Sequence, residues 1–252
     1  MKKTVFLIII TAITVLCILL GAFRHLHISD KPSKKFGSSI GRSIHNATSF
    51  ADDFFDDLDD DAEWSYNDSD NLEKFDSIKI DGHVMGIEIK YGSTYSINTK
   101  YIHDWMKPAH KVSDGVLKIS QPGFRRKRVA NGNCKVSITI PQGIKLDSLH
   151  INVDVGGVTI DDLQIEDGVI STDVGGIDLD NVEFETFKIT SDVGGVSVNL
   201  ASPISEYTLD VRSDIGGISV TGASAKRSYS QYGTTDKYLK VKTDVGGIEI
   251  KQ

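Results

Sequence analysis

The chain has 252 residues and a formal net charge of −7, a length that allows one principal domain with appendages. Residues 1–49 carry seven Lys/Arg and one Asp, whereas residues 50–70 carry nine Asp, one Glu and no base. The remainder, 71–252, is nearly balanced, with 21 bases and 24 acids. This distribution does not fit a nucleic-acid-binding protein, and two cysteines cannot form a disulfide framework within the domain.

The first 23 residues predict a membrane anchor. Lys2 and Lys3 precede an uncharged, mostly apolar run, residues 4–23, that is long enough to span a bilayer as a helix. A cleaved signal peptide is the alternative. The leading lysines favour an inside N-terminus, but further bases follow the span and pull the other way. We expect a single-pass protein of the cell membrane with an extracellular C-terminal domain.

Residues 24–70 predict a linker that is first basic and then acidic. Its second half places apolar side chains among the acids at roughly helical spacing: Phe50, Phe54, Phe55, Leu58 and Trp64. This pattern fits either a short amphipathic helix or a solvated acidic stalk. The strand pattern begins near Leu72, so the main domain is expected at 71–252.

Five copies of one short phrase dominate that domain. The copies are Asp154-Val-Gly-Gly-Val158, Asp173-Val-Gly-Gly-Ile177, Asp192-Val-Gly-Gly-Val196, Asp214-Ile-Gly-Gly-Ile218 and Asp244-Val-Gly-Gly-Ile248. Their aspartates lie 19, 19, 22 and 30 residues apart. A period of about 20 residues predicts a β-solenoid in which each repeat is one coil.

Apolar and polar residues alternate on both sides of each glycine pair, as expected for strands with one buried face. Stacked coils would align Ile151 and Val155 with their counterparts in two interior ladders. The counterparts are Ile170 and Val174, Ile189 and Val193, Val211 and Ile215, and Val241 and Val245. The glycine pairs would form sharp corners between short strands. These glycines are Gly156, Gly157, Gly175, Gly176, Gly194, Gly195, Gly216, Gly217, Gly246 and Gly247.

The aspartates before the glycines allow two roles. Asp154, Asp173, Asp192, Asp214 and Asp244 can each bond to backbone amides at the corner, as Asp does in many turns. Alternatively, carboxylates stacked about 4.8 Å apart would need bridging cations such as calcium. The phrase differs from the nonapeptide of calcium-binding β-rolls, so the turn role is favoured and no metal or cofactor is expected.

Three further segments carry predictions. His83-Val-Met-Gly86 resembles a divergent sixth copy of the repeated phrase, which would suit the first coil of a solenoid. The stretch 221–238, rich in Ser, Thr, Tyr and Gly, reads as a projecting loop. Asp114-Gly115 predicts a turn before a strand, and Cys134 opens a strand in which core packing is favoured over catalysis.

The strands Val136-Ser-Ile-Thr-Ile140 and Leu146-Asp-Ser-Leu-His-Ile151, followed by the glycine repeats, resemble a bacterial adhesin-type domain family of unknown function. The resemblance covers about residues 72–252. It implies a right-handed parallel β-helix or β-roll and a setting in the Gram-positive cell envelope. The layout is similar to that of the membrane-anchored member encoded with the Lia cell-wall stress system. Family members more often carry Ser-Gly-Asp at the corner, and the family offers no catalytic residues to carry over.

The sequence therefore favours a membrane-anchored, non-catalytic binding protein of the cell envelope. Its partner would be a protein or a cell-wall polymer, and neither nucleic acid nor a small-molecule substrate is expected. The basic cluster Arg125, Arg126, Lys127 and Arg128 is a candidate contact patch, or simply a solvated loop. A structural spacer or regulatory subunit is the alternative. A glycan-acting β-helix enzyme using Asp161, Asp162, Asp178 and Asp180 is less favoured.

Overall fold

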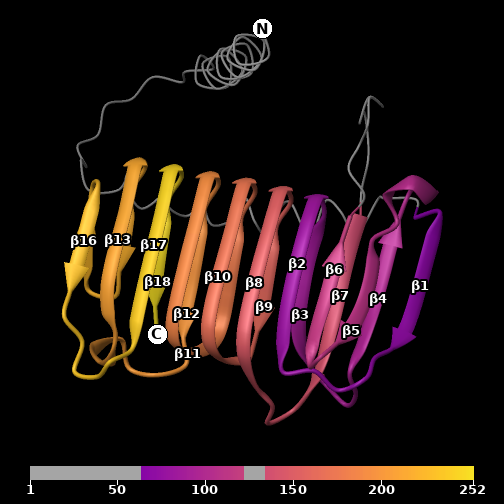
Figure 1. The fold of residues 1–252 in the computed structure, drawn as a ribbon. Coiled ribbons are helices and arrows are strands. Elements are labelled where there is room, and N and C mark those ends of the chain that lie inside the picture. The colour runs from indigo at the N-terminus through magenta and orange to yellow at the C-terminus, as the bar shows by residue number, and fades with distance from the viewer. Residues whose placement is uncertain (1–63, 122–133) are drawn as a thin grey trace, which may run out of the picture. The chain divides into compact units, whose positions relative to one another are not determined.

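The computed structural model describes residues 64–121 and 134–252 (Figure 1). The expected anchor at 1–23, nearly all of the linker, and the cluster Arg125–Arg128 lie outside these residues. Within the described part no helix is long and apolar enough to cross a membrane. The described part contains two short 3₁₀ turns, η1 (Asp104–Met106) and η2 (Ile204–Glu206). The rest is strand and connecting loop, so the all-β prediction is confirmed.

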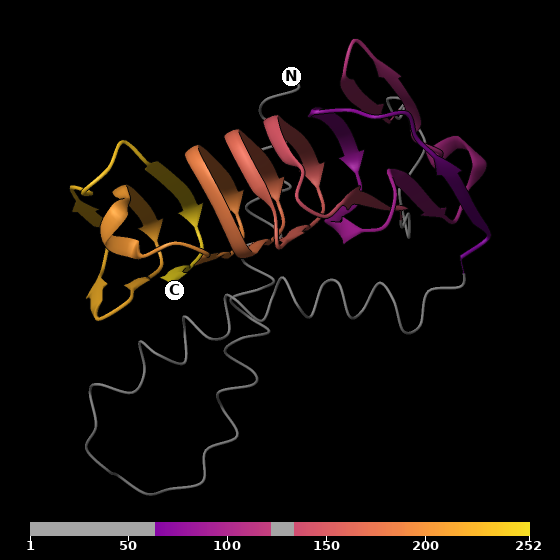
Figure 2. The same cartoon turned by 90° about the horizontal axis from the view of Figure 1, so that it is seen from below.

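The strands form two sheets joined by the corners of the coils. Sheet B runs, in lateral order, β5 (Ala109–Ser113), β6 (Val116–Ser120), β2 (Ser77–Val84), β8 (Lys145–Val155), β10 (Gln164–Val174), β11 (Ile177–Val193), β17 (Tyr238–Val245), β13 (Thr208–Ile215) and β16 (Ser228–Gln231). Figure 2 shows successive coils side by side from below.

Sheet A runs in the same lateral direction. Its order is β1 (Tyr66–Asn71), β4 (Ser96–Tyr101), β7 (Cys134–Pro141), β3 (Gly86–Gly92), β9 (Val158–Asp161), the start of β11, β12 (Val196–Leu200), β18 (Ile248–Lys251), β14 (Ile218–Val220) and β15 (Ala223–Ala225). Pairing is parallel through the middle of both sheets and antiparallel at their ends. The two sheets, curled around one core, make a β-solenoid.

Rows of aliphatic side chains fill the space between the sheets. One row crosses sheet B through Ile80, Ile151, Ile170, Ile189, Val241 and Val211, all of them buried. Sheet A contributes Ile87, Val158, Ile177, Val196, Ile248 and Ile218, which are buried as well. The predicted ladder of Ile151 and its counterparts is therefore confirmed. Each buried aliphatic side chain contributes about 1.5–3 kcal/mol relative to exposure.

The coils are not stacked in sequence order. Strand β17, from the last repeat, pairs with β11 on one side and with β13 on the other. In Figure 1 the yellow β17 accordingly lies between β13 and the strands of the preceding coils. The coil of Asp244 is thus inserted between those of Asp192 and Asp214. The 30 residues between Asp214 and Asp244 had suggested a loop. They instead let the chain form the last coil of the solenoid, at Asp214, and then return to insert the coil of Asp244 before it.

Both ends differ from the expectation. The segment 221–238 contains β15 and β16, which pair antiparallel with β14 and β13 and cover that end of the solenoid. The divergent copy at His83 is not the end coil, because β6 and β7 stack on its outer side. The edge strands at both ends are short, which protects a solenoid from edge-to-edge association.

Two local features lie near the start of the domain. Strand β1 includes residues 66–70, which the sequence assigned to the linker, because Tyr66 stacks on Tyr101 at 4.8 Å and Tyr101 donates to Asp68 at 2.8 Å. The turn at Asp114-Gly115 is confirmed, with φ of 54° and 75°, and joins β5 to β6. Cys134 is buried, as predicted.

A half-buried ion cluster holds the inserted coil in place. Lys237, just before β17, donates to Glu183 Oε1 at 3.0 Å, Glu206 Oε2 at 2.9 Å and Ser202 Oγ at 3.1 Å. Its ammonium also lies 5.3 Å from the centre of the Tyr207 ring. These contacts join three separate stretches of chain at the point where the last coil enters. Although burial lowers the pKa of Lys237, its bonds to Glu206 and Glu183 outweigh this and raise the pKa overall.

Replacing this lysine should weaken the insertion. We expect Lys237→Met to lower the free energy of unfolding by about 1–3 kcal/mol, because two partly buried carboxylates lose their cation. Lys145→Met is the matched control, since Lys145 also lies near two carboxylates, Glu166 at 3.4 Å and Glu185 at 3.9 Å, but is exposed. The control should cost under about 0.5 kcal/mol. Equal losses in urea unfolding would contradict a special role for Lys237.

Candidate functional site: the glycine corner and its outward ladders

The glycine corner is the point of closest approach between coils. The amide of Gly156 donates to Val174 O, that of Gly175 to Val193 O, and that of Gly194 to Val245 O, each at 2.9 Å. The amide of Gly246 continues the series by donating to Ile215 O at 2.9 Å. A second series follows each corner, in which Val158, Ile177 and Val196 donate to Gly176, Gly195 and Gly247 at 3.0 Å. Backbone groups of neighbouring coils therefore satisfy one another.

This stacking leaves no room for a side chain on the first glycine of each pair. A Cβ on Gly175 would overlap the carbonyl of Gly156, and a Cβ on Gly194 would overlap the carbonyl of Gly175. Gly246 and Gly216 meet the preceding coils in the same way. The φ angles of Gly156, Gly175, Gly194 and Gly216, between 152° and 159°, are also disfavoured for other residues.

The aspartates do not cap these corners, because in the described part of the chain the corner amides donate to backbone carbonyls and not to these carboxylates. The corner amides are already bonded to carbonyls of the next coil, so the carboxylates turn outward. Strand register aligns them in one row that begins with a histidine: His83, Asp154, Asp173, Asp192, Asp244 and Asp214. Adjacent members are about one strand spacing, ~4.8 Å, apart.

Bases partly compensate this aspartate row. His83 Nδ1 lies 2.7 Å from Asp154 Oδ2, and Lys242 Nζ lies 2.7 Å from Asp244 Oδ1. In the middle, burial raises the pKa of Asp173, and the negative charges of Asp154 and Asp192 raise it further. The row is therefore an uninterrupted line of carboxylates with a base near each end.

The residue after each aspartate is also exposed, which corrects the expected second interior ladder. Val155, Val174, Val193, Val245 and Ile215 keep 38%, 41%, 46%, 43% and 67% of their surface accessible. The strand alternation breaks here because the glycine corner follows directly. The inward position falls two residues earlier instead, at Val153, Thr172, Ser191, Thr243 and Ser213, all of them buried.

A second group of acids lies on sheet A. Strand register brings Asp161 beside Asp180, and Asp178 lies on the same face. Burial raises the pKa of Asp161, and the charges of Glu88, Asp178, Asp180 and Asp162 raise it further. A carboxyl with a raised pKa beside ionised carboxylates is an arrangement that glycosidases use. Here, however, the group lies on the outer face of a sheet, where water has access.

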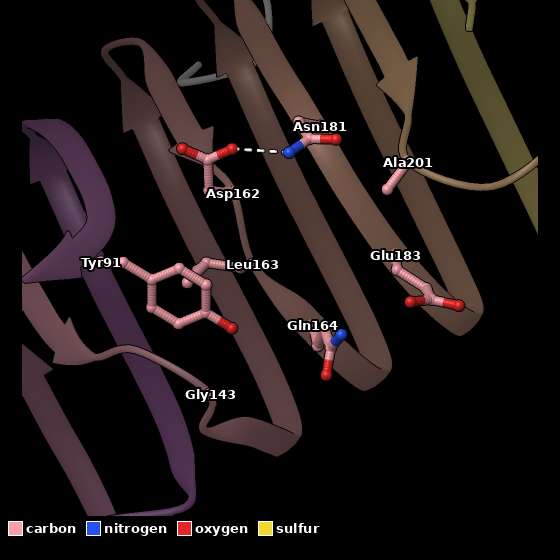
Figure 3. Close-up of a pocket in the computed structure, with 8 residues that line it drawn as sticks. All are labelled: Tyr91, Gly143, Asp162, Leu163, Gln164, Asn181, Glu183 and Ala201. Carbon is pink, nitrogen blue, oxygen red and sulfur yellow. Dashed lines mark hydrogen bonds between the residues drawn. The ribbon is translucent and has the colours of Figure 1, made fainter.

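The nearest hollow is small. It has a volume of about 210 Å³ and lies at the corner opposite the glycines, where Asn181 donates to Asp162 at 2.6 Å and Tyr91 and Glu183 form the sides (Figure 3). Pockets for drug-sized ligands usually start near ~300 Å³. Asp162 and Asn181 have φ of 58° and 51°, so this corner is a turn of the coil rather than a cleft between elements.

Other chemistry-bearing residues are placed where they act structurally. Burial raises the pKa of Cys134 to about 12, which leaves its thiol un-ionised and unreactive. The described residues contain no group of three or more His, Cys, Asp or Glu positioned to hold a metal ion. The proposed patch Arg125, Arg126, Lys127 and Arg128 lies outside the described residues, so its role as a contact stays a prediction.

Sequence reasoning missed Gln121, which completes the series of corner hydrogen bonds at the coil of His83. The buried side chain of Gln121 accepts from the amides of His83 at 3.1 Å and Val84 at 2.9 Å, and donates to Val84 O and Met106 O at 3.1 Å. At His83 the Gln121 side chain therefore accepts hydrogen bonds from the corner amides. At the other corners, backbone carbonyls of the neighbouring coil accept them. No local pattern marks a single glutamine for this role, because its partners are distant in sequence.

A family model described as Toastrack DUF4097 matches residues 75–252. The chain belongs to this family. No curated protein matches it. Among solved structures, a protein from Clostridium sporogenes ATCC 15579, provisionally named a cell adhesion protein, is 21% identical with a TM-score of 0.60, covering 74% of this chain and 99% of that one. This likeness supports the fold.

A provisionally named adhesin from Bacteroides fragilis NCTC 9343 is 15% identical, with coverage of 74% and 96%. Its TM-score of 0.37 is too low for a conclusion about this Toastrack domain. The all-β repeat architecture is thus shown, whereas the handedness of its coils and the relation to the Lia system stay predictions.

The corner glycines of this Toastrack domain should not tolerate a methyl group. We expect Gly175→Ala to lower the free energy of unfolding by more than about 3 kcal/mol, because backbone strain of about 1–3 kcal/mol adds to overlap with the Gly156 carbonyl. Gly143→Ala is the control: it has φ of 79° but open space around it, so only about 1–2 kcal/mol should be lost. Equal losses in urea unfolding would show that φ alone matters.

Neutralising the middle of the aspartate row should stabilise the Toastrack domain. Because the pKa of Asp173 is raised above its ordinary value of 3.8, the folded state binds this proton more tightly than the unfolded state. Native stability therefore falls as pH rises from about 3.8 through the native pKa. We expect Asp173→Asn to unfold at higher urea than wild type at pH 7, with the difference vanishing near pH 3.

Asp167→Asn is the control for this comparison. Asp167 is exposed on the same strand, but its row neighbours are Ser148 and Thr186 rather than carboxylates. It should leave the urea midpoint nearly unchanged at both pH values. A loss of stability in Asp173→Asn at neutral pH would instead mean that the carboxylate makes a stabilising contact, such as a bridging cation.

Proposed function

We propose that this chain is a membrane-anchored cell-envelope protein whose Toastrack domain binds another macromolecule without catalysing a reaction on it. The observation that carries the proposal is the set of exposed rows on a backbone fixed by coil-to-coil hydrogen bonds. Each row repeats a side-chain position at one strand spacing. A rigid surface of this kind loses little conformational entropy when an extended partner binds along it.

The chemistry of the described residues also favours binding over catalysis. The Cys134 thiol is buried and un-ionised, and the Nδ1 atom of His83 is paired with Asp154. The raised pKa of Asp161 is the strongest enzymatic feature, but its neighbours lie on the outer face of the sheet. Efficient proton transfer needs a positioned substrate, and the hollow in Figure 3, at about 210 Å³, is smaller than the pockets that usually hold ligands.

The envelope setting rests on three supports. The uncharged run at 4–23 is long enough for an anchor, and a linker follows it. The adhesin-type resemblance points to the bacterial envelope. The structurally similar protein from Clostridium sporogenes bears a cell adhesion name. A role in adhesion or envelope stress is proposed on these grounds, with a cell-wall polymer or an external protein as the partner.

A rigid spacer is the second candidate, and the glycine corner favours it. Coils joined by backbone ladders can hold a membrane segment and a partner at a fixed separation without binding anything themselves. Exchange of residues 71–252 for an unrelated β-solenoid of similar length separates the two functions. Restored function with the unrelated solenoid would favour the spacer, whereas loss would favour binding through the Toastrack surface.

The location is tested by protease shaving of intact cells that produce the full chain with a C-terminal tag. We expect the tag to be lost while a cytoplasmic marker protein stays intact, because the domain would lie outside the membrane. Protection of the tag until the cells are lysed would contradict an extracellular domain.

Binding is tested by sedimentation of the purified full chain with isolated cell walls. We expect the chain to co-sediment with the walls, and no co-sedimentation would contradict wall binding.

A further inference from the structure

One outward row of sheet B is strongly basic. Strand register aligns Lys111 with Lys118, Lys118 with Lys79, and Lys79 with His150. The row continues through Val169 to Lys188 and Lys240, and ends at Asp210. We call Lys111, Lys118, Lys79, His150, Lys188 and Lys240 the lysine row. Six strand spacings of about 4.8 Å separate its ends, which is about 29 Å.

The lysine row lacks counter-ions over most of its length. Lys240 lies 3.6 Å from Asp210. Within the described residues, Lys79, Lys111, Lys118 and Lys188 form no ion pair, and all four are exposed. Like charges directly opposite each other on neighbouring strands destabilise a sheet. Five lysines from five strands thus share one row in a chain whose net charge is −7. Because such a row costs stability, we expect it to serve a function.

The flanks of the row limit what can bind there. The aspartate row lies four residues farther along the same strands, as from Lys188 to Asp192, which is about 13 Å. On the other side, Glu166 lies exposed near the start of β10 and Glu185 lies exposed in the middle of β11. A flat anionic membrane would meet these carboxylates as well as the lysines. A linear chain lying along the row would meet the lysines, His150 and Val169, and the nearest acids beside it would be Asp81 and Asp167 in the neighbouring rows.

Nucleic acid fits this face less well than a polymer without bases. Single-stranded nucleic acid usually binds where aromatic side chains stack on its bases. Of the two rows adjacent to the lysine row, one consists of Val116, Ser77, Ser148, Asp167, Thr186, Tyr238 and Thr208, with one aromatic residue. The other consists of Ser120, Asp81, Asn152, Ser171, Thr190, Lys242 and Arg212, with none. The features of the face are therefore charge and a straight repeat rather than stacking platforms.

We propose that the lysine row binds a linear phosphate polymer that lies along the solenoid axis. This rests on the proposed function, because it assigns both the surface and the chemical class of the macromolecule that the domain binds. Each ammonium contacts the polymer as a point charge, and the bound chain releases its counter-ions. If all five lysines contact the polymer, the affinity should fall with salt with a logarithmic slope of about −3.5, at roughly −0.7 per contact.

The test uses the full chain in a non-ionic detergent and fluorescently labelled long-chain inorganic polyphosphate, with binding followed by anisotropy. The row variant carries Lys79→Gln, Lys118→Gln and Lys188→Gln. Because three of the ammonium groups that bind phosphate are removed, its affinity should fall roughly 100-fold at 0.1 M salt, and its salt slope should be shallower by about 2. The control variant carries Lys74→Gln, Lys226→Gln and Lys251→Gln, exposed lysines outside the row, and has the same net charge.

The outcomes separate the surface from the ligand. Equal loss of affinity in both variants would mean that net charge, not the row, governs binding, and no loss in the row variant would also overturn the proposal. Displacement of polyphosphate by mixed micelles containing phosphatidylglycerol, but not by phosphatidylcholine, would point to lipid headgroups instead. Circular dichroism of both variants confirms that each is folded.

Wall sedimentation distinguishes this proposal from the proposed function. If the full chain binds isolated walls, and the row variant and phosphate-stripped walls bind equally well, the lysine row is wrong while the binding function stands. If the wild-type chain binds neither walls nor polyphosphate, the lysine row and wall binding are both wrong, and an external protein is left as the partner under the proposed function. Binding that is lost together in the row variant and on stripped walls supports both.

Discussion

The close backbone approach at the glycine corner is the constraint on which the rest of the solenoid depends. The carbonyl of one corner occupies the space where a Cβ would lie in the next. This contact fixes the separation and register of neighbouring coils at the same time. Once the register is fixed, the interior rows of Ile and Val are aligned as well. A shift by one residue would turn every apolar side chain outward.

The same constraint explains how a coil can be inserted out of order. Every corner offers its neighbour the same pair of backbone series, so the corner of Asp244 fits between those of Asp192 and Asp214 as well as at an end. The ion cluster around Lys237 then favours this arrangement over sequential stacking. A uniform corner makes several stacking orders possible, and the particular side chains at the opposite edge select one.

The sequence predicted the parts of the structure that depend on local pattern. Alternation identified the strands and the interior row of Ile151, and Asp114-Gly115 identified a turn. It failed where the outcome depends on a neighbouring coil. The aspartates were assigned to corner amides, yet another coil's carbonyls already satisfy those amides. Val155 was assigned to the interior because a strict alternation of period two cannot show where the glycine corner shifts it.

The lysine row illustrates the same limit for function. Its lysines come from β2, β5, β6, β11 and β17, and no short window of the sequence contains more than two of them. A motif search looks along the chain, whereas a solenoid builds its surfaces across the chain. The repeated phrase that dominates this sequence therefore describes the scaffold. The residues that vary between repeats, once the coils are stacked in their actual order, form the surface that a partner would recognise.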